Sequence, residues 1–154
     1  MSPRYWLFKS EPETFSLTDL QAVGEAGEIW DGVRNYQARN FLRDDCRVGD
    51  IVLFYHSNTK EPGIVGEARI VETEVEDPTQ FDQHSVYFDP KSSRDKPRWY
   101  TVKIRFVKKW KRAVTLTELK SVRALQKMPL VQRGNRLSIS PVSAEEYQVI
   151  KKLI

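Results

Sequence analysis

Two adjacent segments of strand-forming residues constrain the fold most. "GDIVLFYHS" (residues 49–57) is rich in β-branched and aromatic residues, and "IVGEARIVETEV" (residues 64–75) follows after the turn sequence "NTKEPG". Two such runs joined by a short connection with Pro and Gly are typical of a hairpin-like pair of strands. The sequence therefore predicts a β-sheet that includes this pair.

The remaining segments predict further strands and short helices. The apolar run at residues 4–10 predicts a buried strand, the alternation at residues 100–107 predicts a strand with one basic face, and residues 136–142 predict a short strand. A helix is predicted over residues 35–42, where Ala38, Phe41 and Leu42 share a face. Three more helices are predicted from capping boxes: Ser16/Asp19, Thr115/Glu118 and Ser143/Glu146. Residues 77–97 contain too many helix and strand breakers for regular structure, and loops of that length are usually functional or mobile.

This order of elements predicts an α+β fold. We expect one domain over residues 1–154, with a mixed sheet of about five or six strands, curled towards a barrel, and short helices at its ends. The single Cys46 allows no internal disulfide, and two His residues offer no zinc spacing, so we expect no metal and no cofactor. The sequence contains neither a signal-peptide core nor an apolar run of roughly 18–20 residues. A cytoplasmic protein without a membrane partner is therefore expected.

The sequence offers little support for catalysis. It contains no G-x-S-x-G, Walker or H-E-x-x-H motif. His56 could act as a base, although an imidazole at a strand end is more often hydrogen-bonded into a loop. Asp44 and Asp45 beside Cys46 would raise its pKa, which argues against a nucleophilic thiol. We therefore expect a protein that is not an enzyme.

Charge is distributed unevenly along the chain. The net charge is +4, yet residues 98–112 contain seven Lys or Arg and no acid, whereas residues 67–77 are rich in Glu. The molecule is expected to have two electrically different faces. The basic residues of the predicted strand and its continuation either contact phosphates or form a solvated surface: Lys103, Arg105, Lys108 and Lys109.

Five motifs resemble, in order and nearly end to end, those of the EVE domain family. They are "YWLFKSEPETFS", "WDGVRNYQARNFLR", "FYHSNTKEPGIVGEARIV", "DPKSSRDKPRW" and "NRLSISPVS". The resemblance implies a PUA-like fold, a small curled mixed β-barrel with peripheral helices, similar to the YTH domains that read methylated adenine in RNA. It also implies binding of a modified base in DNA or RNA.

The resemblance to YTH domains suggests residues for a base pocket. Lys9 and Ser10 stand where a Lys-Ser pair ends the first strand and lies at the pocket. In YTH domains a Trp after the first helix forms one wall of the aromatic cage, and Trp30 follows the first predicted helix here. The second aromatic wall is where this sequence departs from the YTH pattern, and Tyr87 and Phe88 are candidates for it.

The residues around Trp30 suit recognition of a base. Trp30 could stack on the ring and Asn35 could read its hydrogen-bonding edge, with Tyr36 beside them, while Arg34 or Arg39 could hold a phosphate. Two residues have structural alternatives, Asn35 as the N-cap of the next helix and Trp30 as part of the core. Ser57 and Asn58 could line the rim or simply form a turn.

The sequence thus predicts a non-catalytic, monomeric binder of a modified base in DNA or RNA. Two other functions are compatible with it. The same pocket could belong to an enzyme acting on a modified nucleotide or nucleoside if His56 or a carboxylate reached the ligand. Alternatively, the acidic segment Glu72–Asp77 could dock a basic protein partner.

Overall fold

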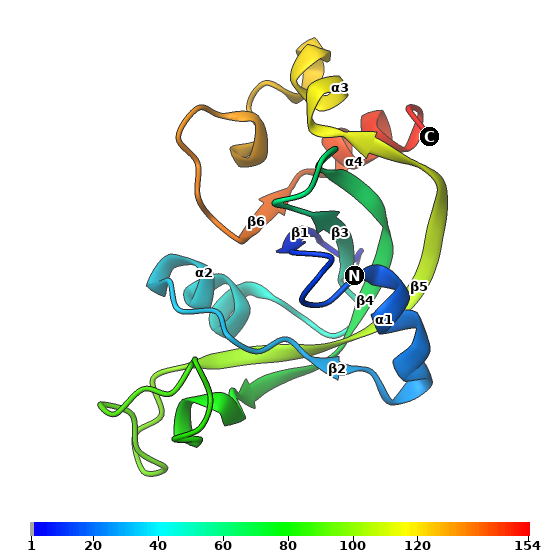
Figure 1. Ribbon diagram of the computed structural model, residues 1–154. Coiled ribbons are helices and arrows are strands. Elements are labelled where there is room, and N and C mark those ends of the chain that lie inside the picture. Colours follow the sequence, from blue (N-terminus) through cyan, green and yellow to red (C-terminus); the bar gives the residue numbers. More distant parts are fainter. Residues whose placement is uncertain (1) are drawn as a thin grey trace.

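The computed structural model describes residues 2–154 and shows one curved sheet with short helices around it (Figure 1). The strands are β1 (Tyr5–Ser10), β2 (Glu28–Ile29), β3 (Ile51–His56), β4 (Gly63–Glu76), β5 (Tyr100–Thr115) and β6 (Ile139–Val142). The helices are α1 (Leu17–Val23), α2 (Tyr36–Asn40), α3 (Leu116–Ser121) and α4 (Ala144–Lys151).

The sheet has six strands in the order β2-β5-β4-β3-β1-β6. β1 and β3 are parallel and all other neighbours are antiparallel, so the predicted mixed α+β fold is confirmed. The long strands β4 and β5 bend around the other strands (Figure 1). However, the two edge strands, β2 and β6, do not pair with each other within residues 2–154, so the predicted closure into a barrel is not confirmed.

Alternation along the central strands creates two apolar cores, one on each face of the sheet. Trp6 and Phe8 of β1 point into one core, together with Phe54 of β3, whereas Leu7 and Leu53 point into the other. Because side chains alternate across a strand, these nearly continuous apolar runs require cover on both faces. The first core packs against the α1–β2 side of the molecule, which is where the candidate site lies.

Local sequence signals located the helices well. All three capping boxes form, and α1, α3 and α4 begin directly after Ser16, Thr115 and Ser143. β3 and β4 form the predicted antiparallel pair. Two boundaries differ from prediction: β5 continues to Thr115 instead of ending at residue 107, and the two-residue strand β2 was not predicted. β5 lies between β4 and β2 and pairs with both of them.

Two further observations concern membranes and metals. Within residues 2–154, no helix is long and apolar enough to cross a bilayer. In the same part of the chain, no group of three or more His, Cys, Asp or Glu side chains is arranged to hold a metal ion.

Candidate functional site

A cavity of about 410 Å³ opens where β1 ends. β1 and β3 are parallel, so their carboxyl ends meet at one edge of the sheet, and the Ser57 N–H donates to the Ser10 carbonyl there at 2.9 Å. The connection from β2 to α2 forms the facing wall, and Tyr87 comes from the long β4–β5 connection. Segments that are distant in the sequence therefore build the cavity together.

The cavity collects six of the ten residues predicted to bind the ligand. These six are Lys9, Ser10, Trp30, Arg34, Ser57 and Tyr87. The remaining four are absent from its lining: Asn35, Tyr36, Asn58 and Phe88. Their role in binding stays a prediction, and the structure assigns several of them other contacts.

Trp30 belongs to both the core and the cavity wall. Its side chain is only 8% exposed, and its ring contacts Phe8, Phe15 and Phe54 at centroid distances of 5.5, 6.2 and 5.5 Å. Its backbone is fixed at both ends, because its N–H donates to Val102 and its carbonyl accepts from the hydroxyl of a β5 threonine. An aromatic wall held this firmly needs little ordering when a ligand binds.

Tyr87 lies against Gly32 and gives the cavity a second aromatic ring. A Cβ atom at Gly32 would come within 2.6 Å of the Tyr87 ring, so only glycine allows this approach. Gly32 also has a φ of +83°, which other residues rarely adopt. Of the two aromatic candidates for the second wall, Tyr87 lines the cavity and Phe88 does not.

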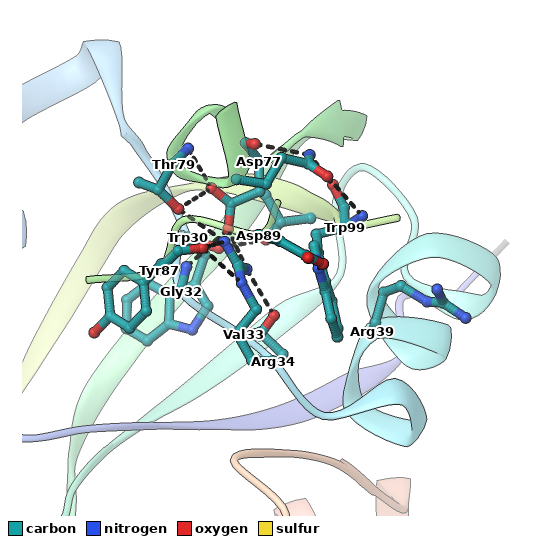
Figure 2. Close-up of polar contacts among 12 residues, drawn as sticks. Trp30, Gly32, Val33, Arg34, Arg39, Asp77, Thr79, Tyr87, Asp89 and Trp99 are labelled. Atoms are coloured by element: carbon teal, nitrogen blue, oxygen red, sulfur yellow. Dashed lines mark hydrogen bonds and ion pairs between the residues drawn. The ribbon is translucent and has the colours of Figure 1, made fainter. Parts of the chain in front are cut away.

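Arg34 holds Tyr87 in place from within the protein (Figure 2). Its guanidinium donates twice to the Tyr87 carbonyl, at 3.1 and 2.7 Å, and once to Asp77 at 3.0 Å. It lies between the rings of Tyr87 and Trp99, at 5.7 and 5.0 Å from their centroids. These contacts use most of its donors, so Arg34 fixes the cavity wall in this structure, whereas the sequence suggested that it holds a phosphate.

Asp77 is the carboxylate around which this wall is organised. Its side chain is 2% exposed, and it accepts hydrogen bonds from the Gly32 N–H, from Arg34, and from both the N–H and the hydroxyl of Thr79. A buried charge is tolerated when it is paired and hydrogen-bonded in this way. Asp77 therefore links the β2–α2 connection to the start of the β4–β5 connection.

The β4–β5 connection is irregular, as predicted, except for a short 3₁₀ helix at Pro78–Phe81, and it is tightly hydrogen-bonded. Gln80 is fully buried; its amide donates to the carbonyls of Asp77 and Trp99, and its side-chain oxygen accepts from Ser92 and from the Arg98 and Trp99 N–H groups. The Trp99 indole donates to Asp89 at 2.7 Å. Of the two properties common among long loops, function or mobility, these contacts favour the first.

Asn35, Tyr36 and Arg39 lie beside the cavity. The Asn35 side-chain oxygen accepts from the Ala38 N–H at 2.9 Å and caps α2, which confirms its structural alternative. Tyr36 is half exposed and stacks on Trp99, with ring centroids 4.9 Å apart, and the Arg39 guanidinium lies 4.7 Å from the Tyr36 ring centroid and 5.9 Å from that of Trp99. Asn58 has a φ of +51°, the backbone of a turn-forming Asn.

Charged groups of both signs face the cavity. Lys9 is half-buried and has no ion-pair partner among residues 2–154, and burial lowers the pKa of its amine. Burial, and then the charge of Asp77, raise the pKa of Asp31 more than Arg34 lowers it. Burial and Asp31 also raise the pKa of Glu28. The cavity can therefore offer both hydrogen-bond donors and acceptors to one ligand.

The residues considered for catalysis have structural roles. The His56 Nε2 accepts from the Leu17 N–H at 3.2 Å, so the neutral ring carries its proton on Nδ1 and ties α1 to β3. Burial and the charge of Lys109 lower the pKa of His56. Cys46 is 1% exposed, and its pKa is raised by burial and by Asp50 and Asp45, which leaves the thiol protonated and inert.

The basic residues predicted to contact phosphates lie along β5. Lys103 is 3.6 Å from Glu72 of the neighbouring strand, so part of its charge is neutralised. Arg105 is partly buried opposite Arg69, and the side chains of Lys108 and Lys109 are exposed. No basic residue of β5 lines the cavity. A phosphate role for these residues stays a prediction.

The most important residues that the sequence did not reveal are Asp77, Gly32 and Gln80. Gly32 belongs to the Asp31-Gly32 turn signal, which could have indicated its φ but not its contact with Tyr87. Asp77 was read as part of an acidic segment, and Gln80 carried no signal. Both residues also have local partners, but the contacts that build the wall are distant in the sequence, from Asp77 to Arg34 and from Gln80 to Trp99, and no local pattern could identify those.

Comparisons with known proteins match nearly the whole chain. The model of the EVE domain matches residues 4–153. Thymocyte nuclear protein 1 from Homo sapiens is 43% identical over 97% of this chain and 73% of its own length. A protein from Pseudomonas syringae, known from its crystal structure, is 49% identical with a TM-score of 0.92, over 97% of this chain and 98% of that one. Human THYN1, crystallised in complex with DNA containing 5-methylcytosine, is 43% identical with a TM-score of 0.88, over 97% of this chain and 96% of that one.

Proposed function

Because this chain belongs to the EVE domain family, we propose that it binds a modified base of a nucleic acid in the cavity at the end of β1, without catalysing a reaction. The family membership confirms the resemblance seen in the sequence. A structural relative with 43% identity was crystallised with DNA that contains 5-methylcytosine, so a methylated cytosine in DNA is the first ligand to test.

The observation that carries this proposal is the composition of the cavity. Trp30 and Tyr87 provide aromatic surfaces, and polar groups of both kinds lie around them. A volume of about 410 Å³ lies within the range of sites for small ligands, roughly 300 to 1,000 Å³. A base inside a duplex cannot reach such a cavity, so it must first leave the stack.

The lining offers a partner for each part of a methylated cytosine. Lys9 can donate to the carbonyl oxygen O2 or the ring nitrogen N3, and the carboxylates of Glu28 or Asp31 can accept from the exocyclic amine. Apolar contact with a methyl group is available from Phe15, Ile29 and Val33, which also line the cavity. A rigid aromatic surface with donors and acceptors at its edge reads a base by stacking and by its hydrogen-bonding pattern.

The chemistry of the lining supports binding rather than catalysis. His56 and Cys46 are absent from the lining, and both are used structurally. The titratable groups of the lining are Lys9, Arg34, Arg136, Tyr87 and the carboxylates of Glu11, Glu28 and Asp31, and they do not form the paired base and orienting group of a nucleophilic site. Binding to RNA, a monomeric state and a cytoplasmic location stay predictions that follow from the sequence alone.

A titration with matched oligonucleotides tests the proposal. We expect a duplex with one 5-methylcytosine to bind more tightly than the same duplex without the methyl group, as measured by fluorescence anisotropy. Trp30→Phe keeps a smaller aromatic face, so it should reduce the affinity less than Trp30→Leu, with both variants first shown to be folded. Equal affinity of the wild-type protein for both duplexes, and for the other modified bases in a panel, would refute the proposal.

A further inference from the structure

A second cavity adjoins the base cavity. Its volume is about 620 Å³, and Lys9 lines both cavities. The second cavity is formed by the last part of β3, the start of α3 and the segment of residues 126–135 that precedes β6. This segment is held next to Lys9, because the Lys9 N–H donates to the Ser138 carbonyl at 2.9 Å. A ligand that extends beyond the base cavity past Lys9 would enter the second one.

The two cavities differ in charge. The lining of the base cavity includes Glu11, Glu28 and Asp31 as well as basic residues. The lining of the second cavity includes Lys9, Lys120 and Arg133, and no acidic residue is among the described residues that form it. A polyanion that approaches the base cavity is therefore attracted from the side of the second cavity and repelled by the acidic groups of the first.

The cations around the second cavity are available to a ligand. Lys120 and Arg133 are exposed, as is Arg136, which lines the base cavity on the same segment. None of these three forms an ion pair with any acidic residue in the described part of the chain. By contrast, Lys103 on β5 is already close to Glu72.

The neutral residues of the second cavity suit a sugar-phosphate chain. Asn135 provides an amide group at the cavity, and Tyr55 and Leu130 are among its apolar residues, whereas the Gln126 amide already donates to the Lys120 and Val122 carbonyls. Amide side chains commonly contact phosphate and sugar oxygens, and the apolar part of the lining can pack against the sugar. The Asn135 oxygen accepts from the Leu137 N–H, which fixes the bend that presents Arg133 and Arg136.

The arrangement of the fold separates this surface from the basic strand. In Figure 1 the orange segment that leads into β6 lies on the left of the view, as α2 does, whereas the middle of β5 lies on the right. A nucleic acid whose base enters the cavity beside Lys9 can reach the orange segment with its next phosphates.

We propose that the second cavity binds the phosphates next to the recognised base through Lys9, Lys120 and Arg133, and that Arg136, on the lining of the adjoining base cavity, adds a further contact. This inference rests on the proposed function, because the position of the bound base determines where the sugar-phosphate backbone of the nucleic acid lies. The ligand of the second cavity is the phosphates of a nucleic acid, and contacts to phosphates do not distinguish one base sequence from another. The second cavity thus gives affinity and direction, and the base cavity gives specificity.

The salt dependence of binding tests this site. Anisotropy titrations at several KCl concentrations would use a fluorescein-labelled duplex with one 5-methylcytosine and its unmethylated match. Each lost phosphate contact reduces the log-log slope by about 0.9, so the loss of affinity relative to the wild type is roughly eightfold larger at ~0.1 M than at ~1 M salt. We expect Lys120→Gln and Arg133→Gln to flatten the slope by up to this amount and to weaken binding of both duplexes equally.

Lys108→Gln and Lys109→Gln are matched controls, because they remove the same charge from exposed positions on β5. We expect them to leave the slope within about 0.2 of the wild-type value, well below the change of about 0.9 for one phosphate contact. If they flatten it and the second-cavity variants do not, the proposed phosphate site is wrong, while preference for the methylated duplex still supports the base cavity. If the wild-type protein has no such preference but its slope depends on Lys120 and Arg133, the phosphate site stands and the proposed function fails. Absence of any oligonucleotide binding overturns both.

Discussion

Asp77→Asn is the substitution that best tests how the base cavity is built. The Asp77 carboxylate accepts four hydrogen bonds: one oxygen takes the Gly32 N–H and Arg34, and the other takes the N–H and hydroxyl of Thr79. Asparagine is similar in size but has only one oxygen and no charge. Its amide nitrogen must face either the Gly32 and Arg34 donors or the Thr79 N–H, so at least one backbone N–H loses its acceptor.

The size of the effect follows from these contacts. A buried donor without an acceptor costs about 1 to 3 kcal/mol, and a hydrogen bond to a charged group is worth about 1.5 to 3 kcal/mol. Arg34 is 22% exposed and can regain some solvation, so we take the lower part of the combined range. We expect Asp77→Asn to reduce the free energy of unfolding by about 3 kcal/mol, and Tm by roughly 6 to 12 °C.

Urea denaturation followed by fluorescence would measure this change, with Asp95→Asn as the control. Asp95 is an exposed residue of the same connection and has no side-chain hydrogen bond within residues 2–154, so its substitution should change the unfolding free energy by less than about 0.5 kcal/mol. Below the transition, Asp77→Asn should also bind the methylated duplex more weakly, because Gly32 and Tyr87 lose their anchor. If Asp77→Asn matches the wild type in both measurements, the wall does not depend on this carboxylate.

Three other perturbations have defined outcomes. Glu67→Gln should lower the free energy of unfolding by about 2 to 4 kcal/mol in urea, because the buried carboxylate accepts from a Tyr hydroxyl, a Trp indole and a Lys ammonium, and one amide oxygen cannot replace it; an unchanged midpoint would contradict this. Gly32→Ala should displace Tyr87 and weaken binding of the methylated duplex by about tenfold or more, the loss of roughly 1 to 3 kcal/mol of stacking, without unfolding the protein; full affinity would mean that Tyr87 is not a wall. Because the pKa of His56 is lowered in the folded protein, the unfolded chain takes up a proton first as the pH falls. The contribution of the neutral His56 to stability is therefore complete above about pH 6.5 and is lost below it. Urea midpoints from pH 7.5 to 5 should fall more in the wild type than in His56→Gln, and parallel curves would refute the bond to Leu17.

Much of the fold could be predicted because its signals are local. A capping box involves residues three positions apart, and all three predicted boxes begin helices. The same holds for Asn35, whose N-cap role needs only the Ala38 N–H. Strands were found from their apolar runs, but the length of β5 was underestimated because "KKWKR" shows no alternation, although pairing with β4 keeps it extended. Long-range pairing overrides a weak local pattern.

The candidate site was only partly predictable for the same reason. Lys9 and Trp30 came from the family resemblance, and the aromatic residue Tyr87 was one of two candidates. The sequence suggested that Arg34 or Arg39 holds a phosphate, and it cannot show that Asp77 lies 3.0 Å from Arg34, 43 positions further along the chain. Whether an arginine binds a ligand or supports a wall depends on such distant partners. The second cavity could not be predicted for the same reason, since Lys9 and Arg133 line it together only in the folded chain.

The position of the modified base itself tests the central claim most directly. A duplex with one 5-methylcytosine whose methyl group is ¹³C-labelled would be titrated with the protein, and nuclear Overhauser contacts from that methyl group and from the base proton H6 would be recorded. If the base occupies the cavity, its protons contact the ring protons of Trp30 and Tyr87, and their resonances shift through the ring currents of these residues. A methyl group that keeps its free-duplex resonance while the protein is bound, or that contacts β5 instead, would contradict the account.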